Sequence, residues 1–282
     1  MSRLAARVLT GTTLACGAAL LLWLHARYPD APIALAVVTA LTLLSAWELA
    51  HMGALRGRGL GLALAGATLV LAFGLYRGWP GLGADTPALL RLALLYLYAG
   101  MLAVPGFVAA LFVGASAETQ ARSPLEAVAA ALWIVPPLFA IALVEEHFGT
   151  RGLVALIVLA KVGDNAGYFV GRAIGKRHPF PRVSPGKTVA GCVASLVAGV
   201  AAGAALLPFT VGERSLAGVA LGGLFGGLIN VAAQAGDLSE SWVKRKAGVK
   251  DSSALLGPSG GVLDVIDSLL LAAPVALLLW SA

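Results

Sequence analysis

The amino-acid sequence predicts an all-α protein, a polytopic integral membrane helix bundle with about nine transmembrane helices. Hydrophobic residues make up 59% of the 282 residues and charged residues only 12%, whereas soluble domains have about 45–50% apolar and about 25% charged residues. The mean hydropathy is +0.88. Long apolar runs recur along the chain, and a bilayer-spanning helix needs about 20 such residues. The same composition excludes an intrinsically disordered chain, which is poor in apolar residues and rich in charge.

Nine apolar runs, separated by glycine, proline or charged residues, define the expected transmembrane helices. They cover about 8–26, 32–50, 58–76, 87–114, 125–144, 152–173, 188–208, 215–236 and 262–281. Pro105 in the fourth run and Pro136-Pro137 in the fifth predict bends, because proline removes a backbone donor and clashes with the preceding turn. No clear small-residue cleavage site follows the first run, so we expect a retained span rather than a removed signal peptide.

The distribution of basic residues predicts the orientation of these spans. With nine spans and the N-terminus inside, the inner segments carry most of the Lys and Arg residues, as the positive-inside rule requires. The loops 174–187 and 237–261 are then both cytoplasmic. The formal net charge of +6 suits anionic headgroups or a phosphate-bearing substrate. A nucleic-acid partner is not expected, since no soluble domain is available to carry a basic face.

Small residues are dense, as close packing of helices in lipid requires. The eighth run contains overlapping pairs of glycines at small-xxx-small spacing, Gly222, Gly223, Gly226 and Gly227. They indicate either tight intramolecular packing or a dimer face. No repeat of fixed period is visible, so an inverted-repeat transporter gains no support.

Charged side chains within spans are costly, about 2.5–3.5 kcal/mol each at a helix centre, and point to function. The first half of the chain has few of them. Glu48, near the end of the second run, is the main exception, and a position at the membrane interface would explain it. The second half contains three polar clusters.

The first cluster lies in the sixth run, where Lys161, Asp164 and Tyr168 are spaced i, i+3 and i+7 and therefore share one helix face. Asn165 lies beside them. This face either lines a polar site or contains a Lys161–Asp164 pair that neutralises itself inside the bundle.

A basic loop follows this helix and leads to Ser184-Pro185-Gly186-Lys187-Thr188 at the start of the seventh run. Such a turn offers backbone N–H groups and an ammonium group to an anion. The alternative is ordinary helix capping by Ser or Thr, combined with positive-inside charge. The spacing is not that of a Walker A loop.

The second cluster is the polar end of the eighth run. If that helix continues beyond the membrane surface, Asp237, Ser241 and Lys244 or Arg245 align on one face at i, i+4 and i+7 or i+8. A carboxylate, a hydroxyl and a cation in one stripe suit a magnesium–phosphate site.

The third cluster begins with Lys250-Asp251 and ends with Asp264 and Asp267, spaced i, i+3 at the head of the ninth run. Two carboxylates on one face repel each other unless a cation lies beside them. Mg²⁺ fits, because it takes one or two carboxylates and leaves its other positions to water and phosphate oxygens. The alternative is that these acids complement the helix dipole.

The stretch from Ser241 to Asp267, S-x-V-K-R-x4-K-D-x-S-x2-L-G-x-S-G-G-x2-D-x2-D, resembles the signature of the phosphatidate cytidylyltransferases (CDP-diacylglycerol synthases). Three further segments resemble the family in the right order: DNAGYFVG at 164–171, SPGKTVAG at 184–191 and GDLSES at 236–241. The resemblance covers roughly the last 120 residues. Three positions depart from the family pattern: Ser259 replaces a usual His, Val265 a usual Arg, and Ala190 a common acidic residue.

The resemblance implies transfer of CMP from CTP to phosphatidate, with CDP-diacylglycerol and pyrophosphate as products. It implies Mg²⁺ bound by Asp237 and Asp264, with Asp267 as a further ligand or supporting residue, a second cation as an option, and a homodimer. Ser241 is expected either to donate a hydrogen bond to a phosphate or to orient Asp237. The expected catalytic residues are Asp237, Ser241, Lys244, Arg245, Lys250, Asp264 and Asp267. The expected substrate-binding residues are Lys161, Asp164, Tyr168, Ser184, Lys187, Thr188 and Asp251.

Residues 1–150 are accordingly expected to form a scaffold with a lipid groove, and residues 151–282 a catalytic region in a bacterial inner membrane, with its active site facing the cytoplasm. Two alternatives stay open. One is a related CTP-dependent membrane enzyme, such as a CDP-archaeol synthase or a polyprenol or phytol kinase. The other is a cation-coupled transporter that uses Lys161, Asp164, Asp264 and Asp267 as a relay.

Overall fold

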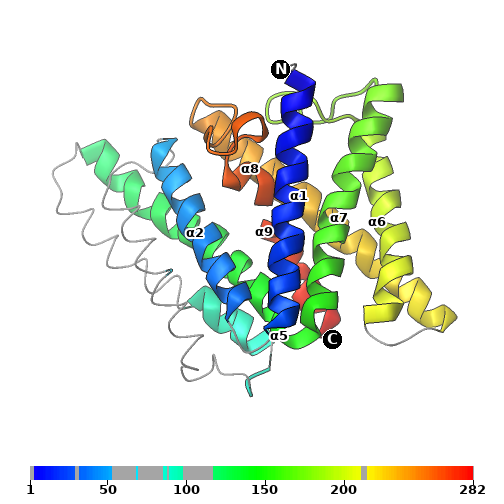
Figure 1. Ribbon diagram of the computed structural model, residues 1–282. Coiled ribbons are helices and arrows are strands. Elements are labelled where there is room, and N and C mark those ends of the chain that lie inside the picture. Colours follow the sequence, from blue (N-terminus) through cyan, green and yellow to red (C-terminus); the bar gives the residue numbers. More distant parts are fainter. Residues whose placement is uncertain are drawn as a thin grey trace. The chain divides into compact units, whose positions relative to one another are not determined.

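The computed structural model is all-helical in the residues that it describes, which are 3–28, 32–52, 68, 85–87, 89–97, 117–210 and 215–281. No strand occurs among them. The helices are α1 (Arg3–Arg27), α2 (Ile33–His51), α5 (Ala117–Ile174), α6 (Val189–Thr210), α7 (Leu216–Lys246), the 3₁₀ turn η1 (Gly257–Ser259), α8 (Val262–Ile266) and α9 (Leu269–Trp280) (Figure 1). A further helical stretch covers 89–97.

Five of the described segments are long and apolar enough to cross a membrane. They are Ile33–His51, Ala129–Ile174, Val189–Pro208, Leu216–Lys246 and Val262–Trp280. The all-α class and the membrane setting are therefore confirmed. The count of about nine spans is not confirmed. The third predicted run, 58–76, apart from residue 68, and most of the fourth, 87–114, lie outside the described residues, and the first run, within α1, is not among the five segments.

The segment Ala129–Ile174 contains two predicted runs. Its 46 residues would extend about 69 Å as one straight helix, more than twice the roughly 30 Å of a hydrocarbon core. Gly149 interrupts it with φ 64° and ψ −172°, a backbone conformation that glycine adopts without steric cost. The non-helical residue is thus Gly149, whereas Pro136 and Pro137 lie within the helix.

The chain forms two compact units that interleave in sequence. Unit 1 comprises Met1–Ala142 and Lys246–Val265, and unit 2 comprises Leu143–Arg245 and Ile266–Ala282. In unit 1, fully buried apolar side chains come from α2 and from the first part of α5, among them Leu49, Leu138 and Phe139. The turn η1 lies against α1.

Unit 2 depends on close backbone contact between α6 and α7. A Cβ added at Gly203 of α6 would meet the backbone of Gly222 and Gly226 of α7, and a Cβ at Gly199 would approach Gly226 as well. Gly223 and Gly227 contact the side chain of Val200 on the same helix pair. Such contacts replace the missing hydrophobic drive between helices in lipid. The interpretation that the α7 glycines Gly222, Gly223, Gly226 and Gly227 serve close packing within the molecule is therefore confirmed.

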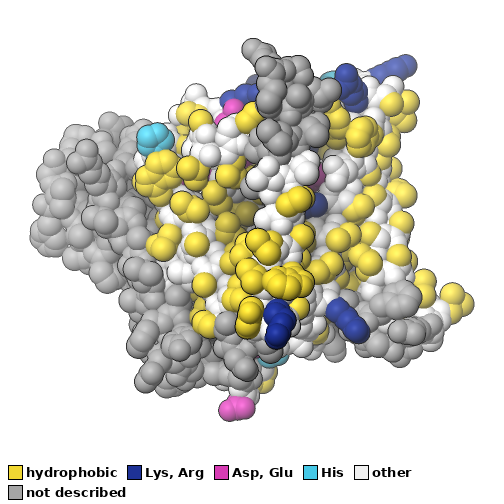
Figure 2. All heavy atoms as spheres, in the orientation of Figure 1, with side chains coloured by type: hydrophobic (Ala, Val, Ile, Leu, Met, Phe, Trp, Pro, Cys, Tyr) yellow, Lys and Arg dark blue, Asp and Glu magenta, His cyan; other side chains and the backbone are white. Residues whose placement is uncertain are grey.

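The second part of α5 packs beside α6 in the same unit, as Figure 1 shows. A Cβ at Gly167 of α5 would meet the carbonyl oxygen of Gly191 of α6 at 3.0 Å. The other side of α6 is exposed and apolar through Val189, Val193 and Val197. Figure 2 shows this surface on its right, with Lys and Arg side chains at the upper margin. An apolar surface with a basic margin suits contact with lipid tails and headgroups.

Candidate active site

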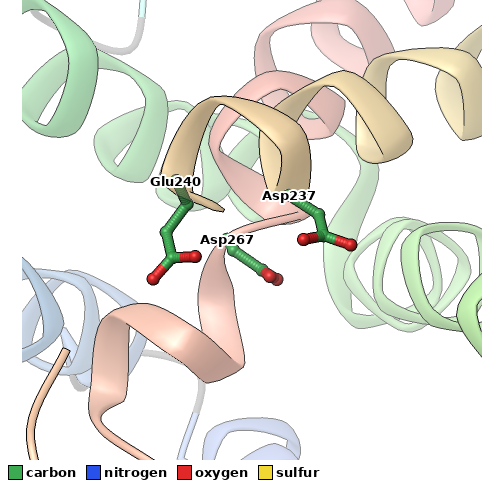
Figure 3. Close-up of side chains that lie close together, drawn as sticks. All are labelled: Asp237, Glu240 and Asp267. Carbon is green, nitrogen blue, oxygen red and sulfur yellow. The ribbon is translucent and has the colours of Figure 1, made fainter. Parts of the chain in front are cut away.

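Three acidic side chains of unit 2 lie close together. Asp237 and Glu240 are on α7, and Asp267 is in the turn between α8 and α9. One carboxylate oxygen from each lies within 4.8 Å of the other two. Figure 3 shows Asp237 and Glu240 projecting from α7 near the segment that carries Asp267. Glu240 is completely buried and Asp267 is 8% exposed, so this acidic cluster is largely removed from water.

A glycine allows α7 to approach the Asp267 turn. A Cβ at Gly236 would clash with the backbone carbonyl oxygen of Asp267 and would contact Ser268. The Asp267 carboxylate is oriented by its own turn, because the backbone N–H of Ser268 donates to Oδ1 at 2.6 Å. Gly236 and Ser268 thus bring carboxylates from two separate chain segments together.

Two lysines from other elements contact the acidic cluster. Lys187, just before α6, places Nζ 2.8 Å from Oδ2 of Asp237. Lys161 of α5 places Nζ 3.3 Å from Oδ1 of Asp267 and 3.6 Å from Oδ2 of Asp164. The predicted Lys161–Asp164 ion pair forms, but the two residues do not neutralise each other alone, because Lys161 lies nearer to Asp267.

A third lysine is paired within α7. Nζ of Lys244 lies 2.6 Å from Oε2 of Glu240, and both side chains are buried. The Ser241 hydroxyl donates to Oδ1 of Asp237 at 3.3 Å, the contact expected if Ser241 orients Asp237. Sequence reasoning missed Glu240, although its i+3 spacing from Asp237 and i−4 spacing from Lys244 place it on the same helix face.

Each carboxylate of this group lies beside an ammonium group. The four carboxylates are Asp164, Asp237, Glu240 and Asp267, and the ammonium groups are those of Lys161, Lys187 and Lys244. Carboxylates crowded together favour a nearby cation, and these lysines supply positive charge to the site.

A buried polar network joins α6 to α7, and α5 packs against it. Asn230 is 1% exposed, and its Oδ1 accepts hydrogen bonds from Ser195 at 3.1 Å and from Gln234 at 2.9 Å. Gly163 of α5 leaves the space that the Asn230 amide occupies. The Gln234 carbonyl oxygen also accepts from Nζ of Lys187 at 3.4 Å. The network ties Lys187 and the start of α6 to α7, the helix that carries Asp237.

Thr188 and Lys187, both in the predicted anion-binding turn, make different kinds of contact. Thr188 is buried, and its hydroxyl accepts a hydrogen bond from the Gly191 N–H at 3.1 Å. That contact is helix capping, the alternative interpretation. Lys187 instead reaches Asp237, and the Ser184 carbonyl oxygen accepts from the Lys187 N–H at 3.1 Å.

Two predicted residues of this region are exposed. Tyr168 is 58% exposed, and its hydroxyl accepts a hydrogen bond from Arg172 at 2.9 Å. Arg245 is exposed, and its Nε donates to the Val183 carbonyl oxygen at 3.3 Å. Arg245 thereby ties the end of α7 to the basic loop.

The remaining predicted residues belong to unit 1. Lys250 and Asp251 are exposed. One oxygen of Asp264, Oδ2, accepts hydrogen bonds from the Ser252 N–H at 2.8 Å, the Ser252 hydroxyl at 2.7 Å and the Gly261 N–H at 2.7 Å. Asp264 is not a member of the acidic cluster, and its role as a metal ligand stays a prediction. Glu48 is completely buried, so its carboxylate is not exposed to water or lipid headgroups, and its position near the membrane interface stays a prediction.

The donor atoms of the acidic cluster fit a hard divalent cation. Mg²⁺ binds oxygen ligands in an octahedron at about 2.0–2.1 Å, so neighbouring ligands are about 3 Å apart and opposite ones about 4.2 Å. One oxygen from each of the three carboxylates lies within 4.8 Å of the other two, so the side chains must draw together to reach that geometry. Asp237, Glu240 and Asp267 can therefore hold such an ion.

Comparisons with known proteins identify the family of this chain. The family model described as the cytidylyltransferase family matches residues 5–282. Proteins named phosphatidate cytidylyltransferase are 43% identical over 129 residues in Brucella suis, 39% over 134 residues in Haemophilus influenzae and 42% over 131 residues in Pseudomonas aeruginosa. Each match covers 46% of this chain and 46%, 46% and 48% of the respective relative, about half the length of these curated proteins.

Proposed function

This chain belongs to the cytidylyltransferase family, and from that premise we propose that it is a phosphatidate cytidylyltransferase. It would transfer CMP from CTP to phosphatidate and release pyrophosphate. The observation that carries the proposal is the acidic cluster of unit 2 with its lysines, Lys161 and Lys187, which combines cation ligands and phosphate-binding ammonium groups. The names of the relatives support the same substrates.

The proposed reaction needs positioning and charge neutralisation rather than a covalent enzyme intermediate. A phosphate oxygen of the lipid attacks the α-phosphorus of CTP. The bond from the α-phosphorus to the oxygen that bridges the α- and β-phosphates breaks, and pyrophosphate leaves. Lys161 and Lys187 each lie beside a carboxylate, and they exchange these partners for phosphate oxygens when the nucleotide binds. Holding both substrates in this arrangement supplies much of the rate enhancement.

Asp237, Glu240 and Asp267 would hold Mg²⁺ in this proposal, with Asp264 as a further candidate ligand and a second cation as an option. A bound Mg²⁺ supplies positive charge against the triphosphate. Ser241 orients Asp237 through its hydrogen bond. Lys244 pairs with Glu240 and supplies positive charge beside that carboxylate.

The other predicted residues receive supporting roles. We assign Arg245 and Lys250, both exposed, to the triphosphate or the lipid headgroup, together with Lys244. Asp251, also exposed, would fix Lys250 or contact the nucleotide. Asp164, Tyr168, Ser184 and Thr188 would border the nucleotide site. The first 150 residues would supply the groove for the acyl chains.

We further propose that the site faces the cytoplasm of a bacterial inner membrane. The excess of Lys and Arg residues in the segments expected to lie inside supports this orientation, and so does a contact within unit 1. Glu48, near the end of α2, accepts hydrogen bonds from the segment 252–263. With the N-terminus inside, the second span ends on the cytoplasmic side, the side on which the loop 237–261 is also expected. The matched relatives come from bacteria.

Purified protein with CTP and Mg²⁺ tests the proposal when either phosphatidate or a polyprenol is offered as the acceptor. We expect pyrophosphate and a nucleotide-bearing lipid from phosphatidate, and neither product when EDTA removes the divalent cation. Release of CDP with a phosphorylated polyprenol would indicate a kinase instead. Ion uptake into vesicles without any nucleotide product would indicate a transporter.

A further inference from the structure

Glu48 forms a hydrogen-bonding centre in unit 1. It lies on the last turn of α2 and is completely buried. Its Oε1 accepts hydrogen bonds from the Ser253 hydroxyl and the Val262 N–H, both at 2.7 Å. Its Oε2 accepts from the Ser252 hydroxyl at 2.9 Å and the Leu263 N–H at 2.8 Å. All four donors are more than 200 residues away in the sequence.

Two of these donors belong to a helix terminus. Val262 and Leu263 are the first two residues of α8, and the first N–H groups of a helix have no partner within the helix. The Glu48 carboxylate supplies that partner. Its two oxygens together have the acceptor capacity for the four hydrogen bonds.

Asp264 accepts hydrogen bonds from other residues of the same segment. It accepts from Ser252 and from the Gly261 N–H. A Cβ at Gly261 would clash with the Ser252 hydroxyl and with Oε1 of Glu48, so only glycine fits between them. The Ser252 hydroxyl lies within hydrogen-bond distance of both carboxylates, and its single proton is shared between them, which links the two acids into one anchor.

The anchored loop carries residues that matter for the proposed reaction. Lys250 and Asp251 precede Ser252, Asp264 lies within the loop, and Asp267 follows α8 directly. We propose that Glu48 is a positioning residue: from the end of α2 it holds the loop 250–264 in the conformation that binds CTP. This inference rests on the proposed function, and Glu48 itself contacts no substrate.

The role requires a carboxylate rather than any polar side chain. In Glu48→Gln the amide NH₂ group replaces one oxygen and faces either the Val262 N–H or the Leu263 N–H, whichever way the amide is turned. A donor then meets a donor, and a buried N–H loses its partner. An aspartate would be one methylene too short to reach all four donors.

Glu48→Gln, compared with wild type and with Glu146→Gln, tests the inference. Glu146 is an exposed acid on α5 outside the anchored loop, so its variant should behave as wild type. We expect faster amide hydrogen exchange at Val262 and Leu263 in Glu48→Gln. We also expect the KM for CTP, measured per folded enzyme, to rise about 10- to 100-fold, the size of effect that a misplaced binding group produces.

A purely structural role would reduce the amount of folded protein and leave the KM of the folded fraction unchanged. Wild-type exchange in Glu48→Gln, or faster exchange with an unchanged KM, would overturn the inference. If Glu48→Gln does not fold, Ser253→Ala removes one of the four hydrogen bonds and should shift both readouts in the same direction by less. Wild-type values for Ser253→Ala in both readouts would then overturn it. If wild-type protein makes no nucleotide-bearing lipid, the proposed function fails, while the exchange measurement still decides whether Glu48 anchors the loop.

Discussion

Replacing Asp267 by asparagine removes one negative charge from the acidic cluster without changing the size of the side chain. Asp267 is one of the proposed Mg²⁺ ligands, and an asparagine amide is an uncharged and weaker ligand for that ion. If about 3 kcal/mol of charge stabilisation in the transition state is lost, kcat/KM falls on the order of 100-fold. The ion pair between Oδ1 of Asp267 and Nζ of Lys161, which are 3.3 Å apart, does not add to this loss, because Lys161 exchanges Asp267 for a phosphate oxygen when the nucleotide binds.

The assay follows transfer of label from CTP to phosphatidate over a range of Mg²⁺ concentrations. Asp267→Asn should lower kcat/KM by that factor and raise the Mg²⁺ concentration needed for half-maximal rate. Asp85→Asn is the matched control, because Asp85 is exposed and outside the acidic cluster. A wild-type rate for Asp267→Asn at both limiting and saturating Mg²⁺ would refute the reasoning.

Three further predictions concern other parts of the site and its support. Lys187→Met removes the ammonium group beside Asp237 and should raise the KM for CTP about 10-fold or more, as expected for a lost hydrogen bond to a charged group; an unchanged KM would exclude Lys187 from nucleotide binding. Asp264→Asn should lower turnover on the order of 100-fold even at saturating Mg²⁺, and near-normal turnover would remove Asp264 from the metal site. Gly226→Ala adds a Cβ against the α6 backbone and should destabilise the folded protein by about 1–3 kcal/mol, measured by thermal unfolding in detergent. Gly17→Ala, where a Cβ meets nothing within 4 Å, should leave the midpoint unchanged, and equal midpoints for both variants would contradict the packing argument.

Contacts within one helix could be predicted from the sequence. The Lys161–Asp164 pair and the Ser241–Asp237 hydrogen bond both form, because spacings of three or four residues place side chains side by side on any α-helix. The all-helical fold follows equally directly from composition, since lipid leaves few other ways to satisfy the backbone.

Contacts between distant segments could not be predicted in this way. Glu48 lies more than 200 residues from the four groups that donate hydrogen bonds to it. The sequence pattern of α2 does not predict that Ser252 or Val262 is among its partners. The small-xxx-small spacing of the α7 glycines could be recognised in the sequence. That spacing does not identify Gly199 and Gly203 of α6 as the residues packed against them. A buried acid such as Glu240 was missed because a charge at the end of a span is normally solvated.

Parallel reactions with CTP labelled at the α-phosphate and at the γ-phosphate test the central claim most directly. The wild-type protein, given phosphatidate and Mg²⁺, should incorporate only the α-label into lipid and release the γ-label in pyrophosphate, and Asp237→Asn should abolish most of this transfer. Incorporation of the γ-label into lipid, or no incorporation of either label by folded wild-type protein, would contradict the account.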